Sequence, residues 1–509
     1  MNFLFDSKKK EKVLFIATEA SPFVKAGGLG EVVFALPRAL KSLGYDVRII
    51  IPLYAGIDKE KFQMTMEHQE LEVPTDVETN TQNEPSYLIC NVKKYSPKNI
   101  NDRMPVTTYF LENREYYEKR SNVYGYSDDV VRWSLLCRGT LEFLRFSDWL
   151  PDVIISNDWQ TGFLPNYLKT VYKNDSRLSK IATIFVIHNL HYQAMFDHRF
   201  VTDMDYDAGQ STIPSFFDPR IYKINGMRRG IMYSDEICTV SPTYSREIMS
   251  KDYGELLDDL LKERKAYLNG ILNGIDYNVF NPETDINLIE NYNFKTLEKR
   301  VKNKIELQKR FNLPQDKNIP LFCIVSRFVE QKGFDLFFNF LEQVIKELKI
   351  QLIVLGSGDA KYMGYFKNLA EVLPKQVSAH LNFDPILPRL IYGGSDIILI
   401  PSKFEPCGLI QIEAMRYGII PIVRSTGGLA DSVIDFNPET NEGTGFVFEH
   451  YDSLSLVLTM ARANENYKNK ILWEKIQKQA MVQDFSWLKS AKEYSKIIKK
   501  AIVLHKNKK

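Results

Sequence analysis

Short apolar runs without regular polar alternation recur along this chain, and helix-like stretches separate them. They are Val13–Thr18, Val47–Ile51, Val153–Ser156, Ile181–His188, Glu236–Val240, Leu321–Ser326, Leu352–Leu355, Ile397–Ile400 and Ile419–Val423. A strand that is covered on both faces needs such a run, because none of its side chains faces water, and parallel sheets have this arrangement. Helical stretches at 31–42, 133–146 and 161–172 provide crossover connections. The sequence therefore predicts an α/β protein built from doubly wound parallel sheets.

The length of the chain predicts more than one domain. Its 509 residues exceed the roughly 250–300 residues at which a single core stops growing. The segment LNGILNGID at 268–276 contains two Asn-Gly pairs, which are typical of turns. We expect Rossmann-like domains at 1–269 and 270–484, followed by a helix at 485–509. Residues 55–105 have no clear period and are expected to form long loops or an irregular hairpin.

The charge balance and the cysteines indicate the compartment of the protein and the kinds of partner it can bind. The chain has 66 basic and 64 acidic residues, so it has no overall electrostatic field that would attract nucleic acid or a membrane surface. No apolar run approaches the roughly 20 residues of a membrane span. The five cysteines are odd in number and lack metal-ligand or redox spacing, which favours a reducing compartment. We expect a cytoplasmic protein without nucleic-acid or membrane partners.

Two glycine turns, one near each end of the chain, have nearly the same sequence. Gly27-Gly28 follows the first apolar run, Gly427-Gly428 follows the last, and a helical pattern comes after each. Glycine lets backbone approach a ligand without a Cβ in the way, and N–H groups at a helix start favour an anion. The pair of turns predicts two phosphate-facing domains that close on one ligand.

Charged and polar residues follow several of the predicted strands, where α/β sheets bind ligands. They are His188 and Asn189, Arg327 and Lys332, Gly356, and Glu405, with Glu413 eight positions further on. Fixed cations stabilise the charge that develops as a nucleoside diphosphate departs, and carboxylates bind sugar hydroxyls. This set suits transfer from a diphosphate-activated donor. Because no metal-ligand cluster accompanies it, we expect no metal or other cofactor.

An ordered series of motifs resembles bacterial glycogen synthases and plant starch synthases, glycosyltransferase family five. The motifs are KAGGLG (25–30), NDW (157–159), VIHNL (186–190), TVSPTY (239–244), GILNGID (270–276), SRFVEQKG (326–333), PSKFEPCGL (401–409) and STGGLAD (425–431). The resemblance runs from about Val13 to about Trp487. It implies a GT-B architecture, in which two Rossmann-like domains face each other across a cleft and the final helix returns to the first domain.

The resemblance also implies an activity: retaining transfer of glucose from ADP-glucose to the non-reducing end of an α-1,4-glucan. Its catalytic residues here would be His188, Arg327, Lys332 and Glu405. Donor contacts would come from Lys25, Gly27, Gly28, Asn189, Asn273, Gly356, Phe383, Cys407, Gly408, Leu409, Glu413, Thr426, Gly427 and Gly428, and acceptor-side contacts from Asp158 and Tyr192. The partners would thus be a nucleotide sugar and an α-glucan polymer.

Some positions depart from the family pattern. Ala26 replaces a usual Thr, Glu31 a usual Asp, and Gln160 a usual His, while Pro388 stands in an altered His-Arg-Ile. None of these changes removes a charge that the leaving group needs.

Alternative functions remain open from the sequence. In the first alternative, the enzyme catalyses the same reaction with UDP-glucose as the donor. In the second, the chain is a glucan-binding regulatory protein on a transferase scaffold.

The retaining reaction has two possible routes: through a covalent glycosyl-enzyme or by front-face attack. The sequence favours front-face attack, because Glu405 is assigned to sugar hydroxyls and no other nucleophile stands out.

Overall fold

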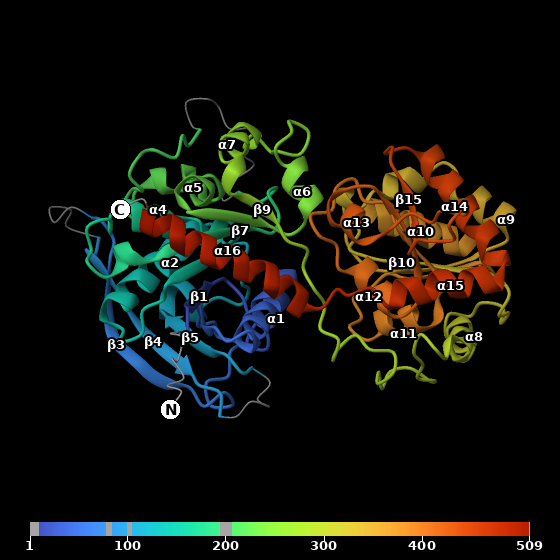
Figure 1. The fold of residues 1–509 in the computed structure, drawn as a ribbon, viewed down its shortest axis with the longest axis horizontal. Coiled ribbons are helices and arrows are strands. Elements are labelled where there is room, and N and C mark those ends of the chain that lie inside the picture. The colour runs from blue at the N-terminus through green and yellow to red at the C-terminus, as the bar shows by residue number, and fades with distance from the viewer. Residues whose placement is uncertain (1–9, 78–83, 99–103, 194–205, 508–509) are drawn as a thin grey trace, which may run out of the picture. The chain divides into compact units, whose positions relative to one another are not determined.

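The computed structural model describes residues 10–77, 84–98, 104–193 and 206–507. The chain divides into two compact units, coloured along the sequence in Figure 1. Unit 1 is formed by the described parts of Met1–Val240, Ser245–Ile271 and Trp487–Lys509, and unit 2 by Ser241–Tyr244 and Leu272–Ser486.

Unit 1 is built on a nine-stranded sheet with the order β3-β4-β5-β2-β1-β6-β7-β8-β9. The strands are β1 (Lys12–Ile16), β2 (Asp46–Pro52), β3 (Thr65–Pro74), β4 (Tyr87–Tyr95), β5 (Thr107–Glu112), β6 (Val153–Asn157), β7 (Ala182–Ile187), β8 (Glu236–Thr239) and β9 (Leu268–Gly270). Pairing from β5 through β9 is parallel, whereas β4 runs antiparallel to both β3 and β5. The fully buried central strands explain why their sequences read as continuous apolar runs.

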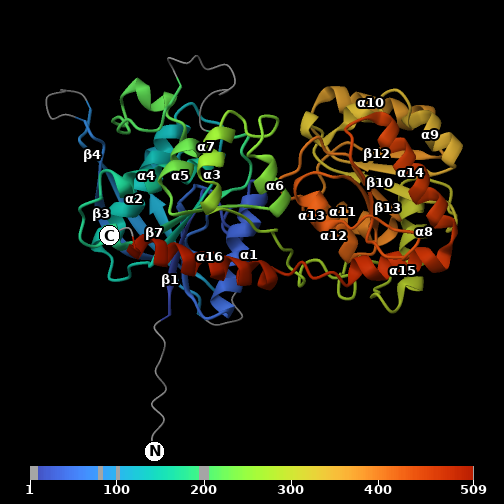
Figure 2. The same ribbon diagram turned by 45° about the horizontal axis from the view of Figure 1, so that its top comes forward.

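Helices surround this sheet, as Figures 1 and 2 show. They are α1 (Gly28–Ser42), α2 (Asp129–Phe146), α3 (Asp158–Thr161), α4 (Phe163–Lys169), α5 (Gly226–Tyr233), α7 (Asp258–Glu263) and α16 (Trp487–Asn507); the division between the units passes through α6 (Pro242–Glu247).

Unit 2 has a six-stranded sheet that is parallel throughout, with the order β12-β11-β10-β13-β14-β15. Its strands are β10 (Leu321–Val325), β11 (Gln351–Leu355), β12 (Val377–His380), β13 (Ile397–Ile400), β14 (Ile420–Arg424) and β15 (Phe446–Phe448). Its helices are α8 (Arg300–Arg310), α9 (Leu341–Leu348), α10 (Ala360–Val372), α11 (Leu387–Gly394), α12 (Ile410–Arg416), α13 (Gly427–Ser432), α14 (Ser453–Lys468) and α15 (Lys470–Met481). The order changes direction between β10 and β13, and a parallel α/β sheet binds ligands at such a switch point.

The last helix of the chain, α16, belongs to the core of unit 1. It lies beside α1 in both views (Figures 1 and 2). Tyr494 and Ile498 on this helix are fully buried in the core of unit 1, and Ser495 shares a 2.6 Å hydrogen bond with Tyr45. The 21-residue helix therefore covers apolar surface that the first 271 residues leave open.

The structure extends the sequence-based prediction in one region and changes it in another. Each predicted apolar run forms a strand of a doubly wound sheet. The region at 55–105 contains the hairpin of β3 and β4, with irregular register near His68, which confirms the expectation of an irregular hairpin there. Pairing at this edge of unit 1 is antiparallel, unlike the parallel pairing of the rest of the sheet. The reason is physical: only Leu71 and Val73 of β3 are buried and its pairing is irregular, so the strand lacks the continuous apolar pattern of a buried strand.

Candidate functional site

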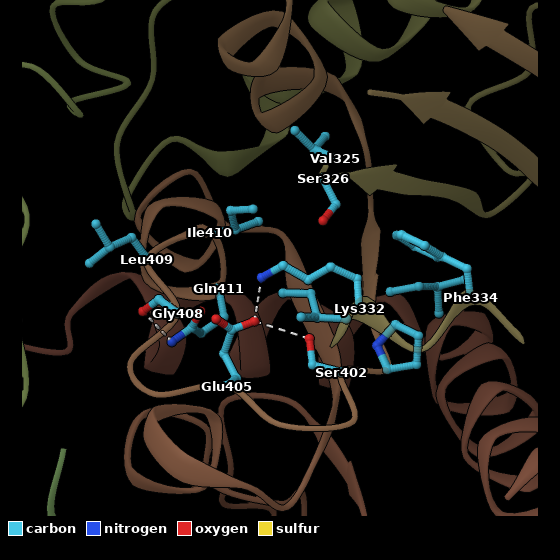
Figure 3. A pocket seen from close by; sticks show the side chains of 13 residues that line it. Val325, Ser326, Lys332, Phe334, Ser402, Glu405, Gly408, Leu409, Ile410 and Gln411 are labelled. Carbon is cyan, nitrogen blue, oxygen red and sulfur yellow. Dashed lines mark hydrogen bonds and ion pairs between the residues drawn. The ribbon is translucent and has the colours of Figure 1, made fainter. Parts of the chain in front are cut away.

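A small pocket of about 60 Å³ lies at the carboxyl ends of β10 and β13 in unit 2 (Figure 3). The segment after β10 supplies Ser326 and Lys332, and the loop after β13 supplies Ser402, Glu405 and Gly408. Both segments belong to the switch point of the sheet, so residues distant in sequence meet there because their strands are neighbours.

An ion pair between Lys332 and Glu405 lies at the centre of this pocket. The Lys332 Nζ is 2.6 Å from Glu405 Oε2, and the two side chains are only 15% and 9% exposed. The Ser402 hydroxyl donates to the same oxygen over 3.0 Å, as the dashed lines of Figure 3 show. The carboxylate is thus held in one orientation through its Oε2, and its Oε1 remains available to accept further hydrogen bonds.

Arg327 follows β10 directly after Ser326 of the pocket lining, and its side chain is exposed. Among the residues that the structure describes, no carboxylate forms an ion pair with its guanidinium. An exposed guanidinium of this kind can make paired contacts with the oxygens of a phosphate group. Arg327 is therefore ready to receive an anion, while Lys332 already has a counter-ion.

The Gly427-Gly428 turn is shaped by the loop that carries Glu405. A Cβ at Gly427 would lie 1.9 Å from the Glu405 carbonyl oxygen, and one at Gly428 would lie 1.9 Å from the Cys407 carbonyl oxygen. The Gly428 N–H donates to the Glu405 carbonyl over 3.1 Å. These glycines are required by close packing of the protein's own backbone, which is a different reason from the ligand approach that the sequence suggested.

The other predicted donor contacts of unit 2 occupy varied environments. Gly356 follows β11, and a Cβ there would lie 1.9 Å from the Ser326 carbonyl oxygen. Cys407 is buried, which raises the pKa of its thiol to about 12 and keeps it protonated. Glu413 on α12 accepts from Tyr392 Oη over 3.3 Å. Phe383 lies after β12 with 84% of its surface exposed.

Asn273, Leu409 and Thr426 complete the set predicted in this unit. Leu409 lines the pocket, and Thr426 is fully buried directly before α13. Asn273 is 6% exposed, and its Oδ1 has no hydrogen-bond partner among the described residues. A buried acceptor without a partner is costly, so Asn273 is the kind of residue that a ligand donor would satisfy.

In unit 1, the first glycine turn already surrounds a carboxylate. Glu19, which is 1% exposed, accepts hydrogen bonds from the N–H groups of Ala26 and Gly27, the latter over 2.9 Å. Lys25 is exposed and forms a 2.5 Å ion pair with Glu31. The expectation that N–H groups of this turn stand free for a phosphate is therefore wrong for Ala26 and Gly27, whereas a Cβ at Gly28 would meet no atom within 4 Å.

His188 follows β7 and is held by two residues of the neighbouring strand end. Asp158 Oδ1 accepts from the backbone N–H of His188 over 2.7 Å, and Asn157 Oδ1 lies 3.0 Å from His188 Nε2. The amide nitrogen of Asn157 donates to the Ile16 carbonyl, so its oxygen faces His188 and Nε2 carries the proton. Burial lowers the pKa of His188 to about 4, which leaves the imidazole neutral with Nδ1 as an acceptor.

Asp158 lies in a strained backbone position, with φ of 57°. Burial raises the pKa of its carboxyl to about 7, although the backbone N–H groups of His188 and Asn189 act in the opposite direction. In this structure it bonds to the backbone that follows β7, so its observed role is to shape the loop of His188. Tyr192, the other predicted acceptor-side residue, is 55% exposed.

Two functional candidates escaped the sequence analysis. Ser402 stands inside the quoted motif PSKFEPCGL, and its hydroxyl orients Glu405. Glu19 directly follows the first apolar run, Val13–Thr18, so its place after a strand was a usable signal. Its hydrogen bonds to the glycine turn could be found only from the coordinates.

The described residues lack the features of a metal site, a disulfide and a membrane-spanning helix. Within residues 10–77, 84–98, 104–193 and 206–507, no three His, Cys, Asp or Glu side chains gather in a way that could hold a metal ion. All five cysteines are buried free thiols. No helix in the described part of the chain combines the length and apolarity that crossing a membrane requires.

Two family models match the chain, one in each half. Residues 12–263 match the starch synthase catalytic domain, and residues 305–483 match glycosyl transferases group 1. With the two parallel-sheet units and the pocket at the switch point, these matches define a glycosyltransferase of the GT-B class, made of two Rossmann-like domains.

The similarity of the chain to individual proteins shows which family it belongs to. The glycogen synthase of Clostridium acetobutylicum is 44% identical over 489 residues, which cover 95% of this chain and 98% of that protein. The glycogen synthase of Thermotoga maritima is 40% identical, covering 96% and 99%. The solved catalytic domain of starch synthase IV from Arabidopsis thaliana, bound to ADP and acarbose, matches with a TM-score of 0.81 and 30% identity, covering 97% of this chain and all of that one. The chain belongs to the glycogen synthase and starch synthase family, glycosyltransferase family five, and is a glucosyltransferase.

Proposed function

We propose that this enzyme transfers glucose from ADP-glucose to the non-reducing end of an α-1,4-glucan, with retention at the anomeric carbon. The observation that carries the proposal is the Lys332–Glu405 ion pair in the pocket at the switch point of unit 2. The relative from Arabidopsis thaliana, whose structure holds ADP and acarbose, supports a nucleotide sugar and a glucan as the two partners.

Unit 2 supplies the groups that hold the donor. Arg327 binds the diphosphate through its exposed guanidinium, and Lys332 stabilises the charge that grows on the leaving phosphate. Glu405 keeps one oxygen on Lys332 and Ser402 and presents the other to the hydroxyls of the donor glucose. Asn273 places its partnerless buried oxygen where a donor hydroxyl or amine satisfies it.

The groups proposed from unit 1 are a neutral imidazole for the sugar, from His188, and the cation of Lys25. His188 is neutral above about pH 4, so its Nδ1 and its backbone carbonyl accept hydrogen bonds from glucose hydroxyls. Lys25 contributes a cation toward the donor once it leaves Glu31, a modest step because both side chains are about half exposed.

Retention proceeds by front-face attack in this proposal. Glu405 is engaged with Lys332 and Ser402 and is assigned to sugar hydroxyls, so it is not the nucleophile. The buried Cys407 thiol is protonated, because burial raises its pKa to about 12. The departing phosphate then accepts the proton of the attacking acceptor hydroxyl, while Arg327 and Lys332 stabilise its charge.

The direct test is incorporation of labelled glucose into glycogen from ADP-glucose and from UDP-glucose in parallel. We expect incorporation from ADP-glucose. Preference for UDP-glucose would overturn the donor assignment and keep the reaction class. Absence of incorporation from both, in a folded protein that still binds glycogen, would favour a glucan-binding regulatory role instead.

We predict that Glu405→Ala lowers the rate at least about 100-fold, because Lys332 loses its counter-ion and the donor loses a hydroxyl acceptor. The matched control is Glu342→Ala, which removes an exposed carboxylate from α9 that pairs with Lys346 at a surface position. Circular dichroism of both variants checks that they fold. Wild-type turnover in Glu405→Ala would remove this residue from the mechanism.

We also predict that the reaction needs no metal. The proposed site neutralises the diphosphate with Arg327 and Lys332, so prolonged dialysis against EDTA should leave the initial rate unchanged. Loss of activity that returns on adding a divalent cation would contradict this assignment.

A further inference from the structure

The turn that carries Lys25, Gly27 and Gly28 is built around a buried carboxylate. Glu19 Oε2 accepts from the N–H groups of both Ala26 and Gly27, and its Oε1 accepts from Tyr124 Oη over 3.0 Å. Glu19 is 1% exposed, so these bonds replace the water that the carboxylate loses on folding. One oxygen of the carboxylate thus binds the turn, and the other binds Tyr124.

The glycines of this turn fit the same carboxylate. A Cβ at Gly27 would lie 3.4 Å from Glu19 Oε1, and a Cβ at Gly30 would lie 3.1 Å from Glu19 Oε2. The second distance is closer than ordinary contact, so a side chain at Gly30 would push against Glu19. The turn therefore closes tightly on this one side chain.

The segment that carries Glu19 is itself anchored. The Thr18 hydroxyl shares a 2.7 Å hydrogen bond with Tyr124 Oη, and Tyr54 Oη donates to the Thr18 carbonyl over 2.8 Å. Tyr54 is buried, as is Thr18. The backbone next to Glu19 is thus held in place by Tyr54 and Tyr124, and Glu19 itself holds the turn.

The start of helix α1 needs such a group. Its N-cap residue is Gly27, which has no side chain to satisfy the first N–H groups of the helix. A carboxylate at a helix N-terminus also interacts favourably with the positive end of the helix dipole. Glu19 places a negative charge at this end from outside the helix, and its hydrogen bonds hold the N-cap residue Gly27 and the preceding Ala26.

We propose that Glu19 is a positioning residue for the donor, one that fixes Lys25 and the Gly27-Gly28 backbone by holding the N–H groups of Ala26 and Gly27. The inference rests on the proposed function, in which this turn meets the donor. In this proposal the anion in the turn is the protein's own carboxylate, which occupies the N–H groups of Ala26 and Gly27. The donor contacts the ammonium of Lys25 and the backbone at Gly28, where a Cβ would meet no atom within 4 Å.

Three variants separate positioning from simple structural support. Glu19→Asp keeps the charge but shortens the side chain, so one oxygen no longer reaches both N–H groups. Glu19→Gln keeps the length: its amide oxygen accepts from both N–H groups, and its NH₂ donates to Tyr124. Tyr124→Phe leaves both bonds to the turn in place and serves as the matched control.

The measurement is the KM for the nucleotide sugar and the KM for glycogen, together with amide hydrogen exchange of Ala26 and Gly27. For Glu19→Asp we expect the donor KM to rise about tenfold and the glycogen KM to stay within about twofold, with faster exchange at both amides. For Glu19→Gln and Tyr124→Phe we expect a donor KM within about threefold of the wild type.

The outcomes are distinct. A Glu19→Asp enzyme with wild-type donor KM, or one whose KM values for donor and glycogen rise equally, overturns the positioning role. A Glu19→Gln enzyme as impaired as Glu19→Asp also overturns it, because Glu19→Gln keeps both hydrogen bonds to the turn and their loss could then not be the cause. A wild-type protein that transfers glucose from neither nucleotide sugar overturns the proposed function, and the positioning role with it.

Discussion

At the scale of single residues, burial favours the neutral forms of His188 and Asp158 in unit 1, whereas unit 2 holds a charged pair. Burial lowers the pKa of His188 to about 4 and raises the pKa of Asp158 to about 7. Lys332 and Glu405 instead satisfy each other at 2.6 Å. Neutral groups suit contacts to sugar hydroxyls, and charged groups suit contacts to a diphosphate.

The raised pKa of Asp158 predicts a pH effect on stability. Between its ordinary value of 3.8 and about 7, the folded state carries a proton that the unfolded state lacks, so the free energy of unfolding falls as pH rises through this window. Asp158→Asn removes this dependence, and Asn tolerates the positive φ at this position.

We therefore expect the wild-type protein to lose stability relative to Asp158→Asn between about pH 4 and about pH 7. Urea unfolding of both proteins at several pH values in this range measures the difference. A stability difference that stays constant with pH would show that Asp158 ionises normally.

At the scale of elements, the two glycine turns have different tolerances although their sequences are alike. Gly428, the second residue of α13, packs against the Cys407 carbonyl oxygen, from which a Cβ would lie 1.9 Å away. Gly28 opens α1 with no atom within 4 Å of a Cβ. Packing thus requires glycine at position 428, whereas at position 28 it leaves room for a side chain.

We predict that Gly428→Ala lowers the free energy of unfolding by at least about 2 kcal/mol, because backbone must move to admit the methyl group. Gly28→Ala is its matched control and should change the free energy of unfolding by less than about 1 kcal/mol, since alanine suits a helix. Thermal unfolding of the two variants measures this contrast. Equal destabilisation would contradict the packing difference.

The short edge strands β9, β12 and β15 depend on neighbouring strands that only the fold brings beside them. The strands β9, β12 and β15 have three or four residues each, too few for a clear pattern along the sequence. They form because each pairs with a longer neighbour, for example β15 with β14. Short edge strands of this kind are decided by pairing and not by their own composition.

At the scale of the whole molecule, the chain forms two separate hydrophobic cores, and its last helix belongs to the first of them. Ile498 of α16 is fully buried in the core of unit 1, and Ile476 of α15 is fully buried in the core of unit 2. The two isoleucines lie near each other in sequence but support different units.

We predict that Ile498→Ala and Ile476→Ala each cost about 2–5 kcal/mol, but in different units. Amide hydrogen exchange, followed by mass spectrometry, should show faster exchange in unit 1 for Ile498→Ala and in unit 2 for Ile476→Ala. Faster exchange confined to unit 2 in Ile498→Ala would contradict the assignment of α16 to unit 1.

The sequence by itself determined the fold class, the strands of both sheets that read as continuous apolar runs, and the family, which its ordered motifs identify. These features depend on local composition and on the order of residues along the chain. The tertiary structure alone decided that Lys332 pairs with Glu405, that Glu19 fills the first glycine turn, and that Gly427 and Gly428 pack against the protein's own backbone. The physical reason is that these contacts join loops from different strands, whose distances are set by the packing of the sheets and not by any short stretch of sequence.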